Sequence, residues 1–328
     1  MMKYSDSAFE KADLVIEQRR RKAENDQQNR MLEISKDAPE VEILQRNLRN
    51  TGLELVKLIM QGGNDTHFLI EKIKEKNLST QHTIEELLEA VKGDRHYLDV
   101  HYYCEKCKDT GYSEGRRCSC MEDLLRKFTT EELNRNCLIE LHDFSEFFLD
   151  FYDKSSDGSF SPYEKMRQNL EYCKEYAENF NTKSPSLFFF GKTGLGKTFL
   201  SSCIAKAMLE KNVNVAFGSI IDFLRKIENE HFGKEQGDTL NILIDADIVI
   251  LDDLGSEFLT AFTESALYDI INCRINLSKP TIISTNLSYS ELDRKYNERI
   301  VSRLTGCFVP LSFVGKDIRH IKMIRNMR

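Results

Sequence analysis

One octapeptide constrains the fold of this chain more than any other stretch: Gly191-Lys192-Thr193-Gly194-Leu195-Gly196-Lys197-Thr198. It follows a short apolar run, 186–190, which indicates a buried strand, and it precedes apolar residues at helical spacing over 199–209. A glycine-rich loop between a strand and a helix directs backbone N–H groups at phosphate oxygens. The sequence therefore predicts a phosphate-binding loop. A glycine-rich turn that binds nothing is the less favoured alternative.

Two acids follow a second apolar run, 248–251, at the point where a strand is expected to end. Downstream of a phosphate loop, this pattern predicts that Asp252 holds Mg²⁺ and that Asp253 orients or deprotonates the attacking water. A third predicted strand, 281–285, ends at Asn286, which could position that water. Strands that alternate with helices predict an α/β domain with a doubly wound parallel sheet. Its ligand is expected outside the carboxyl ends of the strands.

Each residue type of the loop suits one part of a nucleotide. Glycine at 194 and 196 lets the backbone curl around the phosphates. Lys197 is expected to reach the β- and γ-phosphates, with a side chain that faces solvent when no ligand is bound, and the Thr198 hydroxyl is expected to bind Mg²⁺. The predicted nucleotide-binding residues are Gly191, Lys192, Thr193, Gly194, Leu195, Gly196, Lys197, Thr198, Phe199 and Asp252.

Four of the nine cysteines gather within one short stretch. They form a C-x2-C pair and a C-x-C pair separated by ten residues, with glycines in the spacer that suit a turn. Four thiolates at this spacing predict a closed tetrahedral zinc site that is structural rather than catalytic. Four unrelated buried cysteines are the alternative. The predicted ligands are Cys104, Cys107, Cys118 and Cys120.

Length and composition set the frame around these motifs. A chain of 328 residues has room for about two domains, and a net charge of -7 argues against wholesale coating of nucleic acid. We expect no membrane span and no signal peptide, and hence a cytoplasmic protein. Apolar periodicity before the cysteines predicts about three short amphipathic helices. The predicted division is a helical module (1–100), a zinc knuckle (101–121), a linker with an aromatic segment (122–160) and the ATPase domain (161–328).

The aromatic segment holds five rings at 144, 147, 148, 151 and 152. It lies just ahead of the predicted nucleotide domain, so the rings could pack beside the base. We favour the simpler alternative, that they belong to the hydrophobic core.

Together these motifs resemble one family, the bacterial replicative helicase loaders of the DnaC/DnaI type, which are AAA+ ATPases. The stretches that carry the resemblance are Tyr103 to Tyr112 with Cys118-Ser119-Cys120, Gly191 to Leu200, Asp252 to Gly255, Ser284 to Asn286, Glu298 to Leu304 and Gly315 to Arg319. The common AAA+ pattern ends its second motif in Asp-Glu, whereas this chain has Asp252-Asp253.

The resemblance implies a function and further site residues. It implies that the N-terminal module grips the hexameric replicative helicase, and that the AAA+ domain binds ATP and single-stranded DNA and self-associates. It matches Asn286 to sensor I, Arg319 to sensor II and Arg303 to the arginine finger, with Arg299 as the fallback. A surface salt bridge from Arg303 to Glu298 is the structural alternative.

We therefore predict an ATPase that delivers the replicative helicase onto single-stranded DNA during initiation or restart of replication, with ATP, Mg²⁺ and Zn²⁺ as cofactors. Two alternatives stay open. One is the ATPase subunit of a transposition system, which normally lacks the cysteine knuckle. The other is a nucleotide-dependent adaptor that hydrolyses little ATP.

Overall fold

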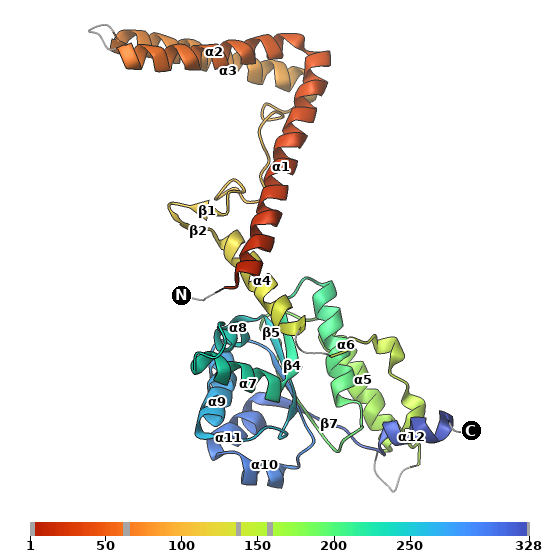
Figure 1. Ribbon diagram of the computed structural model, residues 1–328. Helices are drawn as coiled ribbons and strands as arrows, with labels where there is room; N and C mark the ends of the chain where they lie inside the picture. Colours follow the sequence, from red (N-terminus) through yellow and green to blue (C-terminus); the bar gives the residue numbers. More distant parts are fainter. Residues whose placement is uncertain (1–3, 62–65, 136–138, 156–159, 327–328) are drawn as a thin grey trace. The chain divides into compact units, whose positions relative to one another are not determined.

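A computed structural model describes residues 4–61, 66–135, 139–155 and 160–326 (Figure 1). The chain divides into two compact units. One spans Ala12–Glu122, and the other joins the start of the chain, up to Lys11, to Asp123–Arg328. The two units are described separately below. The functional boundaries predicted from the sequence remain predictions.

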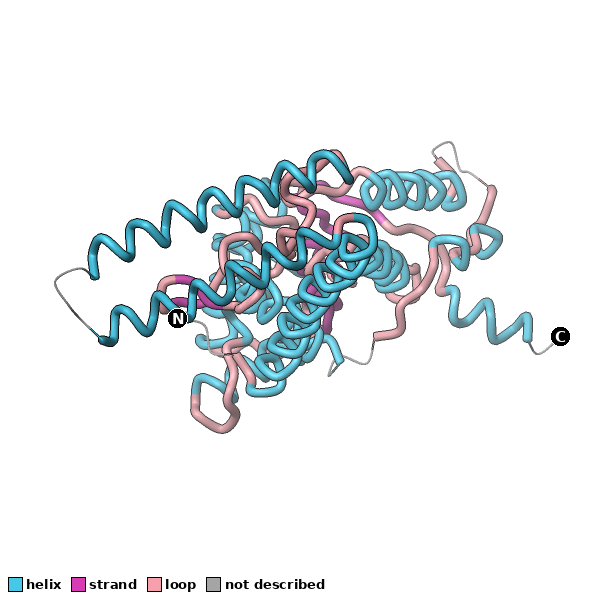
Figure 2. Tube along the Cα trace, turned by 90° about the horizontal axis from the view of Figure 1, so that it is seen from above, coloured by secondary structure: helices cyan, strands magenta, loops and turns pink. Residues whose placement is uncertain are grey.

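The unit Ala12–Glu122 is mainly helical. It contains most of α1 (Asp6–Asp37), then α2 (Pro39–Gln61) and α3 (Thr66–Lys92), and ends in the first turn of α4 (Ser119–Arg135). Both views show α2 and α3 side by side (Figures 1 and 2). At one end of this pair, Ile34, Val41 and Leu88 belong to one buried cluster.

These helices confirm the predicted periodicity, but they are longer than expected. They have 32, 23 and 27 residues. No glycine or proline interrupts the stretches 6–37 and 66–92, so nothing in the local sequence ends either helix early.

The second unit is built on a five-stranded sheet in which every pair is parallel. The strands lie in the order β4-β5-β6-β3-β7. The predicted α/β fold class is therefore confirmed, and β7 lies at one edge of the sheet. The strands are β3 (Ser186–Phe190), β4 (Val215–Ser219), β5 (Ile248–Leu254), β6 (Thr281–Thr285) and β7 (Phe308–Ser312).

Helices cover both faces of this sheet (Figure 1). In β3, Phe188 packs into the core shared with α7 and α9, whereas its neighbours Leu187 and Phe189 pack into the core shared with α5 and α6. This alternation explains why the strand is apolar throughout. The helices are α5 (Pro162–Glu178), α6 (Lys197–Glu210), α7 (Ile220–His231), α8 (Thr239–Asp245), α9 (Ala261–Asn276), α10 (Tyr289–Lys295), α11 (Glu298–Cys307) and α12 (Ile318–Asn326).

A buried cation anchors α8 to this core. Arg274 in α9 is fully buried, and its guanidinium donates to the carbonyls of Leu243 and Ala246 at 2.7 and 2.8 Å. Carbonyls at the carboxyl end of a helix lack partners within the helix, so a cation there satisfies and stabilises them.

Among the described helices, none combines the length and the apolar character needed to cross a bilayer.

Candidate nucleotide site

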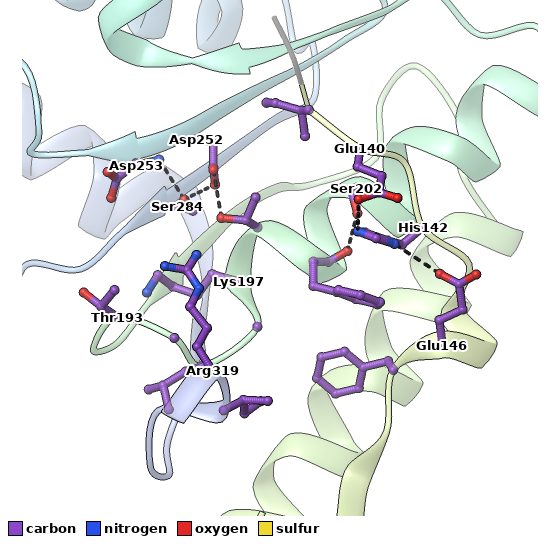
Figure 3. A pocket seen from close by; sticks show the side chains of 18 of the residues that line it. Glu140, His142, Glu146, Thr193, Lys197, Ser202, Asp252, Asp253, Ser284 and Arg319 are labelled. Atoms are coloured by element: carbon purple, nitrogen blue, oxygen red, sulfur yellow. Dashed lines mark hydrogen bonds and ion pairs between the residues drawn. The ribbon is translucent and has the colours of Figure 1, made fainter. Parts of the chain in front are cut away.

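Three neighbouring strands bring the predicted site residues to one edge of the sheet. β5, β6 and β3 lie next to one another and run parallel, so their carboxyl ends meet. A pocket of about 580 Å³ opens there (Figure 3). Among the residues that line it are Thr193, Gly194, Leu195, Gly196, Lys197, Thr198, Phe199, Asp252, Asp253, Ser284, Asn286 and Arg319.

The loop after β3 has a backbone that only glycine adopts easily. Gly194 and Gly196 have φ angles of 76° and 89°. A Cβ on Gly196 would also lie 2.8 Å from the ring of Phe147. Beyond this glycine, the amino terminus of α6 faces the pocket, where its free N–H groups favour an anion.

Residues of the aromatic segment contact the phosphate loop. Tyr152 is buried, and its hydroxyl donates to the Leu195 carbonyl at 2.9 Å. Phe147 is buried in the same core, as the core interpretation of this segment predicts, but Phe148 is exposed and lines the pocket. His142, which the sequence analysis missed, also lines the pocket, and its ring stacks on that of Phe199 at 4.2 Å.

The expectation that Lys197 faces solvent is wrong. The side chain is 8% exposed, and its Nζ donates to the carbonyls of Gly191 and Lys192 at 2.7 and 2.8 Å. Burial lowers the pKa of Lys197, and the charge of Arg319 lowers it further, whereas the carboxylates of Asp252 and Asp253 raise it. The loop folds back around its own lysine, which the linear sequence does not reveal.

Opposite the lysine, hydroxyl groups hold the first acid in place. Asp252 is 8% exposed, and its Oδ2 accepts a hydrogen bond from the Thr198 hydroxyl at 2.8 Å. Its Oδ1 accepts a hydrogen bond from the Ser284 hydroxyl at 2.6 Å. Burial raises the pKa of Asp252, while these two hydrogen bonds lower it. Hydroxyl and carboxylate oxygens are the ligands that Mg²⁺ prefers.

The second acid, Asp253, has a φ of 61°, a left-handed conformation that is costly for a residue with a side chain. It lines the pocket together with Asn286, which is exposed. The site therefore separates its charges, with the cations Lys197 and Arg319 on one side and the two acids on the other (Figure 3). This arrangement fits an anion with a divalent cation bound to it.

The two candidate fingers lie on α11, and neither is among the residues that line the pocket in the described part of the chain. Arg303 donates to Asn272 and to the Tyr268 hydroxyl, both at 2.9 Å, and its guanidinium lies over the Tyr268 ring. No salt bridge from Arg303 to Glu298 is found among the described residues, so that alternative is not supported. Arg299 is exposed.

The four cysteines of the other unit converge. Their sulfur atoms all lie within 4.8 Å of one another, with 3.7 Å between Cys104 and Cys118 and 3.5 Å between Cys107 and Cys120. The strands β1 (Tyr112–Ser113) and β2 (Arg116–Arg117) form a hairpin that brings the two pairs together. A hydrogen bond from the Cys120 backbone N–H is the main cause that lowers the pKa of Cys118, to about 7.

Several known proteins are similar to this chain. Residues 169–304 match the family described as IstB-like ATP binding protein. The chain is 25% identical over 166 residues to the replicative helicase loader DnaI of Bacillus subtilis, covering 46% of this chain and 53% of that one. It is 24% identical over 173 residues to the replicative helicase loader DnaC of Escherichia coli, covering 52% and 67%.

The chain thus spans about half the length of the DnaI relative. Among solved structures, a DnaC helicase loader aligns with a TM-score of 0.44 and 25% identity, over 52% of this chain and 98% of that one. The named relatives and the family match confirm the predicted resemblance to DnaC/DnaI-type proteins.

Proposed function

We propose that this chain, whose ATP-binding domain resembles those of the DnaC/DnaI-type proteins, is an ATP-dependent loader that delivers a hexameric replicative helicase onto single-stranded DNA. The observation that carries the proposal is the pocket at the carboxyl ends of β3, β5 and β6. It joins a phosphate loop to two acids, in a chain whose curated relatives are named helicase loaders. The ATPase domains are proposed to assemble side by side.

In this proposal the pocket also hydrolyses ATP. The loop and Lys197 bind the phosphates, and Thr198 and Asp252 hold Mg²⁺, which neutralises charge on the phosphates when bound. Asp253 orients or deprotonates the attacking water, and Asn286 positions it against the γ-phosphate. Arg319 lies on the cationic side of the pocket, where it would stabilise charge that spreads over the transferred phosphoryl group.

The names of the curated relatives favour a loader over the ATPase subunit of a transposition system. The cysteine knuckle, formed by Cys104, Cys107, Cys118 and Cys120, supports the same choice. A nucleotide-dependent adaptor with little hydrolysis differs from the loader in turnover alone, which is measurable with and without single-stranded DNA.

The cysteine knuckle is proposed to hold a structural zinc ion. Sulfur atoms about 2.3 Å from a tetrahedral zinc ion lie roughly 3.8 Å apart. The distances of 3.7 and 3.5 Å between paired sulfurs fit this geometry. Four thiolates would fill the coordination shell, so the ion would stabilise the fold and leave no position for a substrate.

Purified protein is therefore expected to carry about one zinc ion per chain. Cys118→Ser is expected to lose that zinc, because three remaining thiolates bind it much more weakly. Elemental analysis of protein purified without chelators measures the zinc content per chain. Cys307→Ser, which changes an exposed cysteine of the other unit, is the control and is expected to keep the metal. Wild-type protein without any metal would rule out the zinc site.

The loader proposal requires a complex with the helicase. Mixed with its cognate replicative helicase, the chain is expected to co-elute with the hexamer in size-exclusion chromatography at micromolar concentrations. The N-terminal helical module is proposed to make the contact. Cys118→Ser disrupts the zinc knuckle that directly follows this module, so it is expected to weaken the complex, with ATP binding by the ATPase domain spared. Separate elution of the two wild-type proteins at all concentrations tested would reject the proposal.

A further inference from the structure

The pairing of β5 with β6 breaks where the two acids lie. Leu251 pairs with Ile283 and Leu254 pairs with Thr285, so the register shifts between them. Asp252 and Asp253 in β5 therefore stand opposite one residue in β6, Ser284. Two residues opposite one is the definition of a β-bulge, a distortion that re-aims side chains.

Ser284 bonds to both acids of this bulge. It is 1% exposed, and its hydroxyl donates to Asp252 Oδ1 at 2.6 Å and accepts the backbone N–H of Asp253 at 2.9 Å. The second bond holds the backbone of the residue whose φ is 61°. One side chain thus fixes the carboxylate of the first acid and the backbone of the second (Figure 3).

The first acid is held from both sides. Thr198, at the start of α6, donates to the other oxygen of Asp252 at 2.8 Å. The hydroxyl groups of Thr198 and Ser284 therefore fix the plane of the carboxylate between the phosphate loop and β6. Without Ser284, Asp252 could rotate about its side-chain bonds, and the part-buried N–H of Asp253 would lose its partner.

We propose that Ser284 is a positioning residue for the proposed hydrolysis of ATP, because it aims both acids of the β5 bulge at the pocket. The alternative is that Ser284 only satisfies the backbone N–H of Asp253. The positioning role and the structural role predict different effects of a substitution at Ser284. A positioning residue affects Mg²⁺ binding and the chemical step, whereas a structural residue affects stability alone. This inference rests on the proposed ATPase function, but one of its tests does not.

The test compares Ser284→Ala with a matched control, Thr285→Val. Thr285 is the next residue of the same strand, is fully buried, and donates its hydroxyl to the Leu254 carbonyl rather than to an acid. Both substitutions remove one buried hydroxyl from β6. Melting temperatures of the two variants without nucleotide establish that each is folded and measure the structural cost of each.

The first readout does not depend on turnover. Mn²⁺ binding to the ADP-bound protein is measured by electron paramagnetic resonance. Ser284→Ala is expected to raise the Mn²⁺ concentration for half-saturation about tenfold, as for the loss of one hydrogen bond to a charged group. ADP affinity without metal is expected to stay close to wild type, since Lys197 and the loop are unchanged. Thr285→Val is expected to match wild type in both measurements.

The second readout is turnover at saturating Mg²⁺. Ser284→Ala is expected to lower kcat by about tenfold to a hundredfold with little change in KM, and Ser284→Thr, which keeps the hydroxyl, is expected to recover part of the loss. If Ser284→Ala does not fold, Ser284→Cys, a weaker donor, replaces it with the same expected pattern.

Equal metal affinity and equal kcat in Ser284→Ala and Thr285→Val would overturn the inference. If the wild-type protein does not hydrolyse ATP, the proposed function fails, while the Mn²⁺ measurement still decides the role of Ser284.

Discussion

Lys197→Ala is expected to lower the affinity for ATP by about a hundredfold or more. The Nζ of Lys197 is the buried cation of the phosphate loop, and a charged group removed from a buried contact typically costs 2–5 kcal/mol. Titration calorimetry with a slowly hydrolysed ATP analogue measures the loss directly. Turnover at any practical ATP concentration is expected to fall to background.

The lysine also bonds to the carbonyls of Gly191 and Lys192, so its loss could act through the fold of the loop. Lys211→Ala is the matched control. The Nζ of Lys211 likewise donates to two backbone carbonyls, those of Ala177 and Glu178, both at 2.7 Å. This control is expected to bind ATP as the wild type does. Wild-type ATP affinity in Lys197→Ala would contradict the phosphate-loop assignment.

Arg303→Ala is expected to bind ATP normally but to lower turnover by about a thousandfold or more, the effect of removing an arginine finger. Three nitrogens of this arginine donate to neutral acceptors, the Asn272 side chain, the Tyr268 hydroxyl and the Arg299 carbonyl. These contacts fix the guanidinium without neutralising its charge, which leaves it able to attract an anion. Arg225→Ala, in an exposed ion pair with Asp222, is the control.

The proposed finger acts on the nucleotide of a neighbouring subunit, and mixing tests this directly. A Lys197→Ala subunit keeps its arginine, and an Arg303→Ala subunit keeps its phosphate loop. In an equal mixture, on the order of a quarter of the interfaces pair an intact phosphate loop with an intact arginine. About a quarter of the wild-type turnover should therefore return. DNA or helicase is added to drive assembly, which sizing confirms. No recovery at any ratio would make Arg299 the candidate instead.

The elements that the sequence predicted well are those coded by local patterns. The strand 186–190, the loop and the acids after 248–251 combine apolar periodicity with residue types that one chemistry requires, and β3, β5 and β6 lie where these patterns indicated. The short helices α8 and α10 were not predicted, because seven residues hold too little periodicity.

The details of the site depend on contacts that no single segment contains. The predicted strand ended at Leu251, but β5 continues to Leu254 through a bulge whose register is set by β6. In the sequence, Ser284 stands out only as the first residue of the motif that ends at Asn286. One signal could have identified Ser284. It is a polar residue inside a buried strand, two positions before Asn286, and alternate residues of a strand lie on the same side.

The most direct test of the loader is the amount of helicase that it places on closed circular single-stranded DNA. Such a circle has no end over which a helicase ring could thread. With ATP and this protein, the cognate replicative helicase is expected to co-purify with the circle, and with Lys197→Ala it is expected to stay in solution. The helicase used must be active on linear tailed DNA. Equal amounts of bound helicase with and without the wild-type protein would then contradict the proposal that this chain is a helicase loader.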